Sequence, residues 1–459
     1  MSVQSPLGAT ESGAVQIRPR AFGRVWTLGD RTGLLAIGGL VATTLLVAVS
    51  AAQTNLLLPE SVSLALPSFL AGPFGSTGID LGNYGLIAVL SVMFVSYAVA
   101  VRASERLSAR TVLIGIAAMH ALVLLAPPLL STDIFSYQFY GRMQDLYGAN
   151  PYLAGPHAMQ LDPLYSYIGA KWTNTPTVYG PLFTALSYVF APLSIAGSVI
   201  AYKAIAACAS LGTVALVWNS ARLRGINPVK SAALVGLNPL VVIYGVGGGH
   251  NDLLMMVLLM AGVYLVLAHR ERSGSAMMVI AAAIKLTAGL MLAFALASGG
   301  GRRARDHRRD VLIGAGAAAA LLIGLTFLWF GTGPMHLFAT VQKVQNEGDW
   351  HSIPGFMAAL FGGSVGHVVG DVLGGMFVVL CGWLLWRTWR GELDWINAGA
   401  WAAVALLVAT SSLLPWYVVW LLPLAALATD RRLWQAAMLT TGVVGALQLA
   451  GYVPHVKLF

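Results

Sequence analysis

Residues 33–52 read GLLAIGGLVATTLLVAVSAA, an apolar run without a charged side chain. About 20 such residues are enough for one α-helix to cross the roughly 30 Å hydrocarbon core of a bilayer. Similar runs recur along the chain, in which 57% of the 459 residues are hydrophobic and 10% are charged. A soluble globular domain has about 25% charged residues. The sequence therefore predicts an all-α polytopic membrane protein, whose helices satisfy their own backbone hydrogen bonds in lipid.

The net charge of +9 comes from short basic clusters that lie between the apolar runs. These clusters occupy residues 18–31, 102–110, 222–230, 270–272, 302–309, 387–390 and 431–432. Basic residues in this pattern mark the cytoplasmic loops of membrane proteins. They form no basic stripe beside exposed aromatic residues, so we expect no nucleic-acid partner.

The two cysteines, Cys208 and Cys381, lie inside apolar runs, so neither a disulfide framework nor a zinc site is expected. The N-terminal residues are polar and lack an apolar signal segment, so we expect no cleaved signal peptide. With the basic clusters inside, the pattern predicts about 11 transmembrane helices and two long outer loops. The expected units are a cytoplasmic tail at 1–32, two N-terminal transmembrane helices at 33–110, a core at 111–459, and outer loops at 131–199 and 332–355.

Two segments disturb the alternation of inside and outside. Residues 181–221 hold either two spans or an interfacial helix at 182–195 followed by one span at 200–221. The second interpretation keeps the following basic cluster in the cytoplasm and is favoured. Residues 275–298 have basic clusters on both sides and contain Lys285 and a Thr-Ala-Gly break. They predict two half-length helices in a re-entrant hairpin from the cytoplasmic side, which would separate Lys285 from chemistry on the outer face.

The first candidate site is STDIFSYQFYGR at residues 131–142, directly after an apolar span. A partly desolvated carboxylate at a membrane boundary has a raised pKa and can act as a general base, which favours Asp133. The alternative is that Asp133 only caps the next helix. Tyr137, Tyr140 and Arg142 place aromatic faces and a cation nearby and favour the site.

A second polar motif is GGGHND at residues 247–252. It lacks the Gly-Lys-Ser/Thr of a phosphate-binding loop, so a nucleotide site is not expected. Ionisable residues at the edge of a span are functional candidates, with His250 donating to a phosphate and Asp252 orienting it. The alternative is a capped turn between two spans.

The remaining candidates lie in the second outer loop and at the outer boundary of other spans. Trp416 and Tyr417 either contact a substrate or belong to an aromatic belt at the membrane interface. Lys203 either reaches a lipid phosphate or extends its ammonium towards water.

Seven motifs occur in one order along the chain: DIFSY at 133, NPYLAGP at 150, YGP at 179, NPL at 238, GGHND at 248, IK at 284 and PWY at 415. Together they resemble the polyprenyl-phosphate-mannose-dependent mannosyltransferases of the GT-C superfamily. The similarity is greatest to the actinobacterial α-1,6-mannosyltransferases that build lipomannan. It extends from about Leu113 to Leu424.

The resemblance implies a GT-C-like enzyme in the bacterial cytoplasmic membrane, with its active site on the outer face. It implies a polyprenyl-phosphate sugar donor, a glycan or glycolipid acceptor, and Asp133 as the catalytic carboxylate of the first large outer loop. A phosphate-linked sugar already has a good leaving group, so one base suffices for inverting transfer, whereas a glycosidase needs two carboxylates.

Roles follow for the other candidates. The expected phosphate-binding residues are Arg142, Lys203, His250, Lys343 and His351. The expected sugar- or lipid-binding residues are Tyr137, Tyr179, Asn251, Asp252, Trp350, Trp416 and Tyr417. We expect no required cofactor and assign no metal ligands, although Asp133 with Asp252 or His250 could hold a divalent cation.

Three alternatives stay open. A GT-C transferase for another sugar, such as arabinofuranose or glucose, would have the same motifs. A lipid or solute transporter would have repeated halves and charges near the midplane of the bilayer, and no repeat is found. A non-catalytic partner of envelope-glycan enzymes is the third.

Overall fold

The structure is a computed structural model that describes residues 28–51, 73, 78–299, 304–347 and 349–453. Within these residues the secondary structure is helical, without a β-strand, which confirms the all-α prediction. Most of the expected N-terminal tail and of the loop between the first two spans lies outside the described residues, as do residues 454–459.

The chain begins with three antiparallel helices, α1 (Leu28–Ala51), α2 (Gly82–Ala103) and α3 (Ala109–Leu125), and α1 packs against the other two. The hydroxyl of Ser108 caps α3 by accepting from the Thr111 N–H at 3.1 Å. Tyr97 on α2 donates to the Leu234 carbonyl at 2.8 Å, which fixes these helices to the rest of the bundle.

The first long loop contains α4 (Asp133–Tyr147) and three short 3₁₀ turns, η4 (Pro156–Met159), η5 (Tyr165–Tyr167) and η6 (Ala170–Trp172). The next two helices are α5 (Pro181–Phe190) and α6 (Ile195–Leu223). One short helix thus precedes one long helix, which is the arrangement that the charge pattern favours for residues 181–221.

The middle of the chain consists of short and bent helices. It contains α7 (Pro228–Gly236), the π-helix η7 (Leu240–Val246), α8 (Asn251–Leu267), α9 (Glu271–Ala282), η8 (Leu286–Ala288) and α10 (Gly289–Ala297). The helices α7 and η7 meet at 47°, next to Pro239, which has no N–H to continue a helical ladder. As expected for residues 275–298, α9 and α10 are two short helices that meet at a break.

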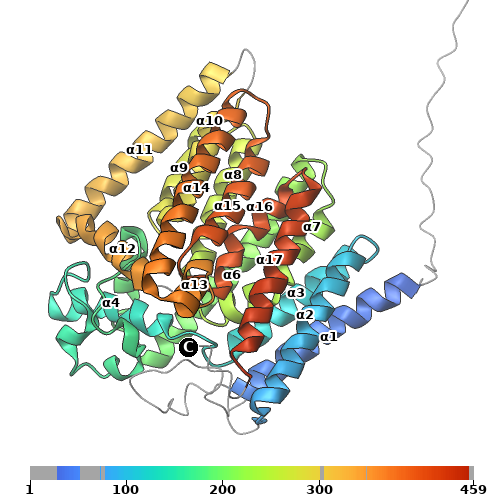
Figure 1. The fold of residues 1–459 in the computed structure, drawn as a ribbon, viewed down its shortest axis with the longest axis horizontal. Coiled ribbons are helices and arrows are strands. Elements are labelled where there is room, and N and C mark those ends of the chain that lie inside the picture. The colour runs from blue at the N-terminus through green and yellow to red at the C-terminus, as the bar shows by residue number, and fades with distance from the viewer. Residues whose placement is uncertain (1–27, 52–72, 74–77, 300–303, 348, 454–459) are drawn as a thin grey trace, which may run out of the picture.

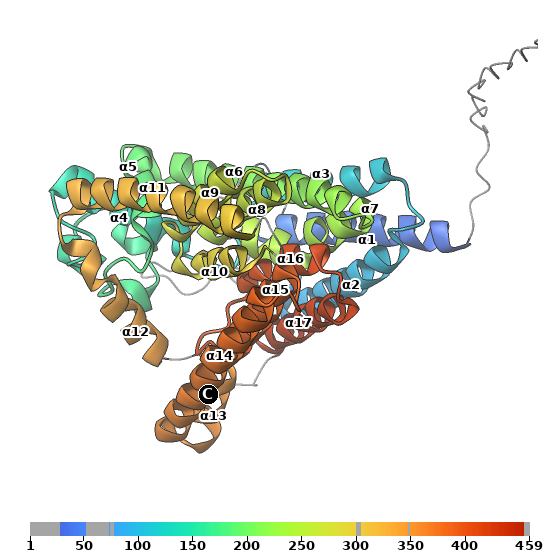
Figure 2. The same cartoon turned by 90° about the horizontal axis from the view of Figure 1, so that it is seen from above.

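The C-terminal part contains α11 and α14, which are the least buried of the six membrane-length helices among the described residues. Its elements are α11 (Ala304–Phe330), η10 (Gly333–His336), α12 (Leu337–Glu347), α13 (Ile353–Phe361), α14 (Gly363–Trp389), α15 (Trp395–Ala409), η11 (Pro415–Trp420), α16 (Leu422–Leu427) and α17 (Arg431–Ala450). Figure 2 shows that α13 and α14 project away from the layer formed by the other helices.

Among the described residues, 6 helices are long and apolar enough to cross a membrane, or 7 if the bent pair of α7 and η7 counts as one. The sequence predicts about 11 crossings, and the structure does not establish that number. Several expected spans are apolar helices of 10–17 residues, among them α3, α8 and α15. Residues 414–428 form a 3₁₀ helix and a short α-helix instead of one regular span.

Basic clusters that are far apart in the sequence are joined by ion pairs. Arg224 pairs with Asp394 at 3.0 Å, and Lys230 pairs with Glu105 at 2.9 Å. Near the base of the hairpin formed by α9 and α10, Arg272 pairs with Asp310 at 2.8 Å. In Figure 1, the segment with α4, which the sequence predicts to be the first outer loop, lies at the lower left, away from the start of α11 at the top.

Candidate active site

Asp133 is the first residue of α4, and its carboxylate faces two other side chains. Its Oδ2 lies 3.4 Å from His250 Nδ1 and 3.4 Å from the hydroxyl of Tyr137. Thr132 occupies the cap position of α4, and no side-chain hydrogen bond caps the helix there. The Asp133 side chain is 18% exposed. It is therefore not a helix cap, and its carboxylate remains accessible.

The ring of His250 is held by stacking on Trp416 and by its close approach to the backbone of Gly248. Its ring is stacked on Trp416, with 3.4 Å between ring centroids and 15° between planes. Nδ1 lies 3.4 Å from the Tyr137 hydroxyl, whereas the buried Nε2 has no hydrogen-bond partner among the described residues. A Cβ at position 248 would lie 2.6 Å from Nε2, so only glycine leaves room for the ring.

The two polar motifs meet because the backbone before Asp133 is fixed to the glycine loop. The N–H of Leu129 donates to the Gly247 carbonyl at 3.0 Å. Lys203, which is 1% exposed, donates to the carbonyls of Ala126 and Pro127. Lys203 thus holds the segment that leads to Asp133, and two of the three donors of its buried ammonium are used by carbonyl oxygens.

Two helix N-termini converge at this site. The first helix is α4, which begins at Asp133, and the second is α8, which begins at Asn251 with His250 in the cap position. A helix N-terminus carries a partial positive charge of about 0.5 and binds anions. The Asn251 amide and Asp252 Oδ2 are buried without a hydrogen-bond partner in the described structure. Buried polar atoms are normally paired, so these atoms are candidates for contact with a polar ligand.

Lys285 contacts this site, although the sequence analysis placed it apart from the outer face. Its Nζ donates to Asp252 Oδ1 at 2.8 Å, and Trp420 Nε1 donates to the same oxygen at 2.7 Å. The expected separation is wrong because the break between α9 and α10 reaches the first outer loop, where the Gly180 N–H donates to the Ile284 carbonyl at 2.9 Å. In the sequence, the feature that points to Lys285 is that it is a single charged residue within an apolar run.

Aromatic side chains surround the polar groups. Tyr137 packs edge-on against Tyr179 at 4.9 Å and against Phe183 at 4.8 Å. Tyr417 is stacked on Trp420 at 4.1 Å. Burial raises the pKa of Tyr137 well above its usual value, and the nearby negative charges of two aspartates raise it further. The Tyr137 hydroxyl therefore stays protonated and can act as a hydrogen-bond donor.

Arg142 does not join the site. It lies nine residues after Asp133, which is about 13 Å along an α-helix and on its opposite side. Its guanidinium donates two hydrogen bonds to Asp162 Oδ2, at 2.7 and 2.9 Å, and Tyr147 donates to the same oxygen. Burial acts to raise the pKa of Asp162, but the hydrogen bonds from Arg142 and Tyr147 outweigh it and lower the pKa. This geometry gives Arg142 a structural contact in place of the expected phosphate.

The candidates of the second outer loop form a separate group. Lys343 is exposed on α12. His351 contacts Asp349 at 2.8 Å, and its ring is stacked on Trp350 with 3.9 Å between centroids. The Asp349 N–H donates to the Ser411 carbonyl at 2.9 Å, which fixes the loop to the segment before η11. No contact of these residues with Asp133 is found in the described structure.

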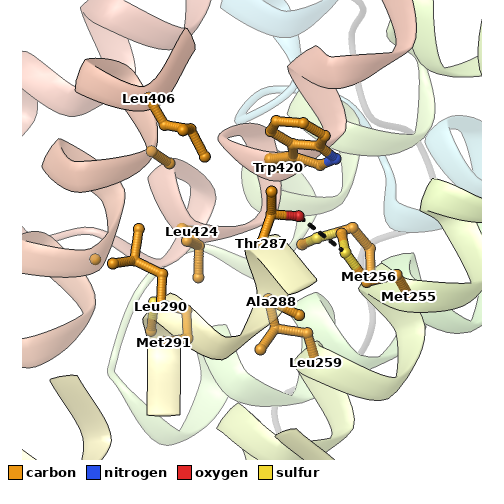
Figure 3. Close-up of a pocket in the computed structure, with 12 residues that line it drawn as sticks. Met255, Met256, Leu259, Thr287, Ala288, Leu290, Met291, Leu406, Trp420 and Leu424 are labelled. Carbon is orange, nitrogen blue, oxygen red and sulfur yellow. Dashed lines mark hydrogen bonds between the residues drawn. The ribbon is translucent and has the colours of Figure 1, made fainter. Parts of the chain in front are cut away.

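A small apolar cavity is lined on one side by Trp420 (Figure 3). It is lined by side chains of α8, η8, α10, α15 and α16, and the Thr287 hydroxyl contacts Met255 Sδ at 3.5 Å. Its volume of about 20 Å³ is close to that of one water molecule, so it is too small for a sugar or an isoprene unit. No group of three or more potential metal ligands occurs among the described residues.

Two family models match most of the chain. The first, described as "Alpha-(1->6)-mannopyranosyltransferase, N-terminal domain", matches residues 36–298, and the second, "MptB C-terminal domain", matches residues 363–450. The first model includes Asp133, His250, Asp252 and Lys285, and the second includes Trp416 and Trp420. No solved structure gives a significant match.

Curated relatives share about a quarter to a third of the residues. Alpha-(1->6)-mannopyranosyltransferase A of Mycobacterium tuberculosis is 29% identical over 68% of this chain and 64% of its own length. The protein of the same name from Corynebacterium glutamicum is 30% identical over 39% of this chain and 36% of its own length. Alpha-(1->6)-mannopyranosyltransferase B of that organism is 27% identical over 67% of this chain and 57% of its own length. The matches thus span less than two thirds of the length of these relatives.

Proposed function

Since the chain belongs to the alpha-(1->6)-mannopyranosyltransferase family, we propose that it is a membrane enzyme that transfers mannose from a polyprenyl-phosphate donor. The proposed acceptor is a glycan or glycolipid, and the proposed product is α-1,6-linked. The relatives are mannosyltransferases by name, and the seven motifs in the chain support the lipid-linked donor.

The observation that carries the proposal is the position of Asp133, whose carboxylate lies 3.4 Å from both His250 Nδ1 and the Tyr137 hydroxyl. In the proposed step, the acceptor oxygen forms a bond to C1 of the sugar. The bond from C1 to the phosphate oxygen breaks, and its electron pair leaves with the phosphate. Asp133 takes the proton of the acceptor hydroxyl. Because the acceptor attacks C1 from the face opposite the phosphate, a β-linked donor gives an α-linked product.

The geometry also suggests what the neighbours of Asp133 contribute. Tyr137 and His250 hold the carboxylate in one orientation, while the stacking of His250 on Trp416 fixes the imidazole ring. Tyr179, which packs edge-on against Tyr137, and Tyr417 add aromatic side chains beside them, and we assign these two residues to contact with the sugar or the lipid. A base held in place before the substrate arrives needs little rearrangement during the reaction.

We place this reaction at the outer face of the bacterial cytoplasmic membrane. The ion pairs that join the basic clusters support one common cytoplasmic end of the bundle. The first outer loop, which carries Asp133, lies away from that end (Figure 1). An outer site suits a lipid-linked donor, because nucleotide sugars are made in the cytoplasm.

The test is mannose transfer by the purified protein in nanodiscs, with polyprenyl-phosphate-mannose and an oligomannoside acceptor. The wild type should transfer mannose, and Asp133→Asn should lose at least about a hundredfold in rate, as expected for a general base. The matched control is Asp145→Asn, at an exposed position on the same helix. Transfer that survives Asp133→Asn would remove Asp133 as the base, and a wild type that is inactive with this donor would contradict the proposed sugar.

The reaction as proposed requires no cofactor. Transfer should therefore persist in the presence of EDTA. A loss of activity that Mg²⁺ restores would instead assign a cation to Asp133 together with Asp252 or His250.

A further inference from the structure

The phosphate-binding residues that the sequence suggests are mostly engaged elsewhere. Arg142 is paired with Asp162, Lys203 binds backbone carbonyls, and Lys343 is exposed on α12. His351 contacts Asp349. His250 lies at the site, but its Nδ1 faces Asp133. A lipid-phosphate leaving group gains negative charge as its bond to the sugar breaks, and it needs a cation close by.

Lys285 is a permanent cation within the contact network that surrounds Asp133. Asp252, to which Lys285 donates at 2.8 Å, is two residues from His250. Ile284 and Ala283, directly before Lys285, accept hydrogen bonds from Gly180 and Leu182, and Tyr179 packs against Tyr137. Two separate chains of contacts thus connect Lys285 to Asp133. The backbone of Lys285 is extended at the break between α9 and α10, so the side chain leaves the hairpin at its tip.

The ammonium of Lys285 retains hydrogen-bonding capacity. A lysine ammonium has three donors, and in the described structure one hydrogen bond goes to Asp252. Its other neighbours are the rings of Tyr417, at 4.5 Å, and Trp420, at 5.1 Å. The side chain is 19% exposed, whereas that of Asp252 is 1% exposed. The lysine is therefore held by a buried carboxylate but is still accessible to a ligand.

Two helix N-termini add positive charge beside Lys285. Asp133 and Asp252 lie in the first turns of α4 and α8, whose N-termini each contribute about half a positive charge. These termini offset part of the negative charge of the two carboxylates, so that Lys285 is not the only positive charge at the site. Trp420, which donates to Asp252, also lines the apolar cavity of Figure 3, so the aspartate that holds Lys285 is itself fixed by a buried ring.

We propose that Lys285 binds the phosphate of the lipid-linked donor, and that Asp252 and Trp420 position its ammonium. This inference rests on the proposed function for the identity of the ligand. In this arrangement, Asp252 is a positioning residue, and Lys285 stabilises the phosphate as it leaves the sugar. The broken hairpin of α9 and α10 then supplies the phosphate site, while the two polar motifs before α4 and α8 supply the base.

The test measures binding of decaprenyl phosphate, without a sugar, to the full chain in nanodiscs, and compares it with binding of uncharged decaprenol. Lys285→Met should weaken binding of the phosphate at least about tenfold, because a charge-assisted contact is lost, and should leave decaprenol binding unchanged. Lys285→Arg should bind the phosphate within a few-fold of the wild type. Equal weakening for both lipids, or no weakening, would overturn the assignment.

Two further variants separate binding from folding. Asp252→Asn combined with Lys285→Met removes both charges, so that no buried carboxylate is left unpaired, and it should still lose phosphate binding. Lys230→Met is the matched control, because Lys230 also pairs with a carboxylate, Glu105, and lies 5.2 Å from a tryptophan ring, at a different site. It should bind decaprenyl phosphate like the wild type, and a loss there would overturn the specific role of Lys285.

Failure of the phosphate site and failure of the proposed function would give different experimental results. If binding of decaprenyl phosphate depends on Lys285 but the wild type transfers no mannose, the phosphate site stands and the sugar assignment fails. If the wild type transfers mannose and Lys285→Met keeps both its binding and its KM for the donor, the proposed function stands and the role of Lys285 is refuted.

Discussion

His250 Nδ1 lies 3.4 Å from Asp133 Oδ2, and this contact joins the loop before α8 to the first turn of α4. The ring of His250 is stacked on Trp416, so three distant segments of the chain fix the position of one carboxylate.

His250→Phe should lower the rate of transfer about tenfold or more. Phenylalanine keeps an aromatic ring against Trp416 but removes Nδ1, and a hydrogen bond to a charged group contributes roughly 1.5–3 kcal/mol. The turnover rate is measured with saturating donor and acceptor. His367→Phe, at an exposed position on α14, is the control and should have wild-type activity. An unchanged rate in His250→Phe would exclude an orienting role for this histidine.

Gly248→Ala should reduce transfer strongly and lower the thermal unfolding midpoint. The added Cβ would lie 2.6 Å from His250 Nε2, so either the ring or the loop must move. The control is Gly316→Ala on α11, where no atom lies within 4 Å of the added Cβ. There, replacement of a helical glycine should be neutral or stabilising by about 0.5–1 kcal/mol. Equal behaviour of the two variants would contradict the close approach at Gly248.

Lys203→Met should destabilise the protein. It leaves the Ala126 and Pro127 carbonyls without their donor, and an unsatisfied buried group costs about 1–3 kcal/mol. We therefore expect a lower unfolding midpoint and a reduced turnover rate, with the KM for the donor nearly unchanged. A large increase in that KM without a loss of stability would indicate that Lys203 binds the donor phosphate after all.

Arg142→Gln should lower stability by on the order of 2 kcal/mol at neutral pH and leave the KM for the donor unchanged. The hydrogen bonds from Arg142 lower the folded-state pKa of Asp162, so their stabilisation is complete above the unfolded-state pKa of about 3.9. It is lost as the pH falls through the lowered folded-state pKa. The unfolding midpoints of wild type and variant should therefore converge in acid, and a constant difference down to low pH would refute the ion pair as the cause.

Much of the site can be predicted from local sequence. Asp133 follows an apolar span, and the GGGHND motif also lies at the end of a span, so both predict functional residues there. In the structure, Asp133 contacts His250 of this motif. The helical period alone would also have excluded Arg142, because a residue nine positions after Asp133 lies on the opposite side of the helix. The order of the motifs carried the family resemblance, which the matching family model confirms.

The contact of Lys285 with Asp252 could not be predicted in the same way. Charge patterns indicate on which side of the membrane a hairpin begins and ends, but they do not give the depth of its tip. That depth depends on the hydrogen bonds from Gly180 and Leu182 to the break, which are contacts between distant segments. The partners of Lys203 and Arg142 could not be predicted for a similar reason, because they are backbone carbonyls and an aspartate whose positions only the fold defines.

The shortness of α9 and α10 has a consequence for the surrounding lipid. The 12 residues of α9 extend about 18 Å, whereas the hydrocarbon of a bilayer is roughly 30 Å thick. In the proposed orientation, with the Arg270 end at the cytoplasmic headgroups, Lys285 lies below the opposite surface, so the phosphate of the lipid-linked donor must descend to meet it. A local depression of the outer leaflet would allow this, and such deformation costs a fraction of a kcal/mol per Å. The enzyme would then respond to the thickness of its membrane, working faster among short acyl chains than among long ones.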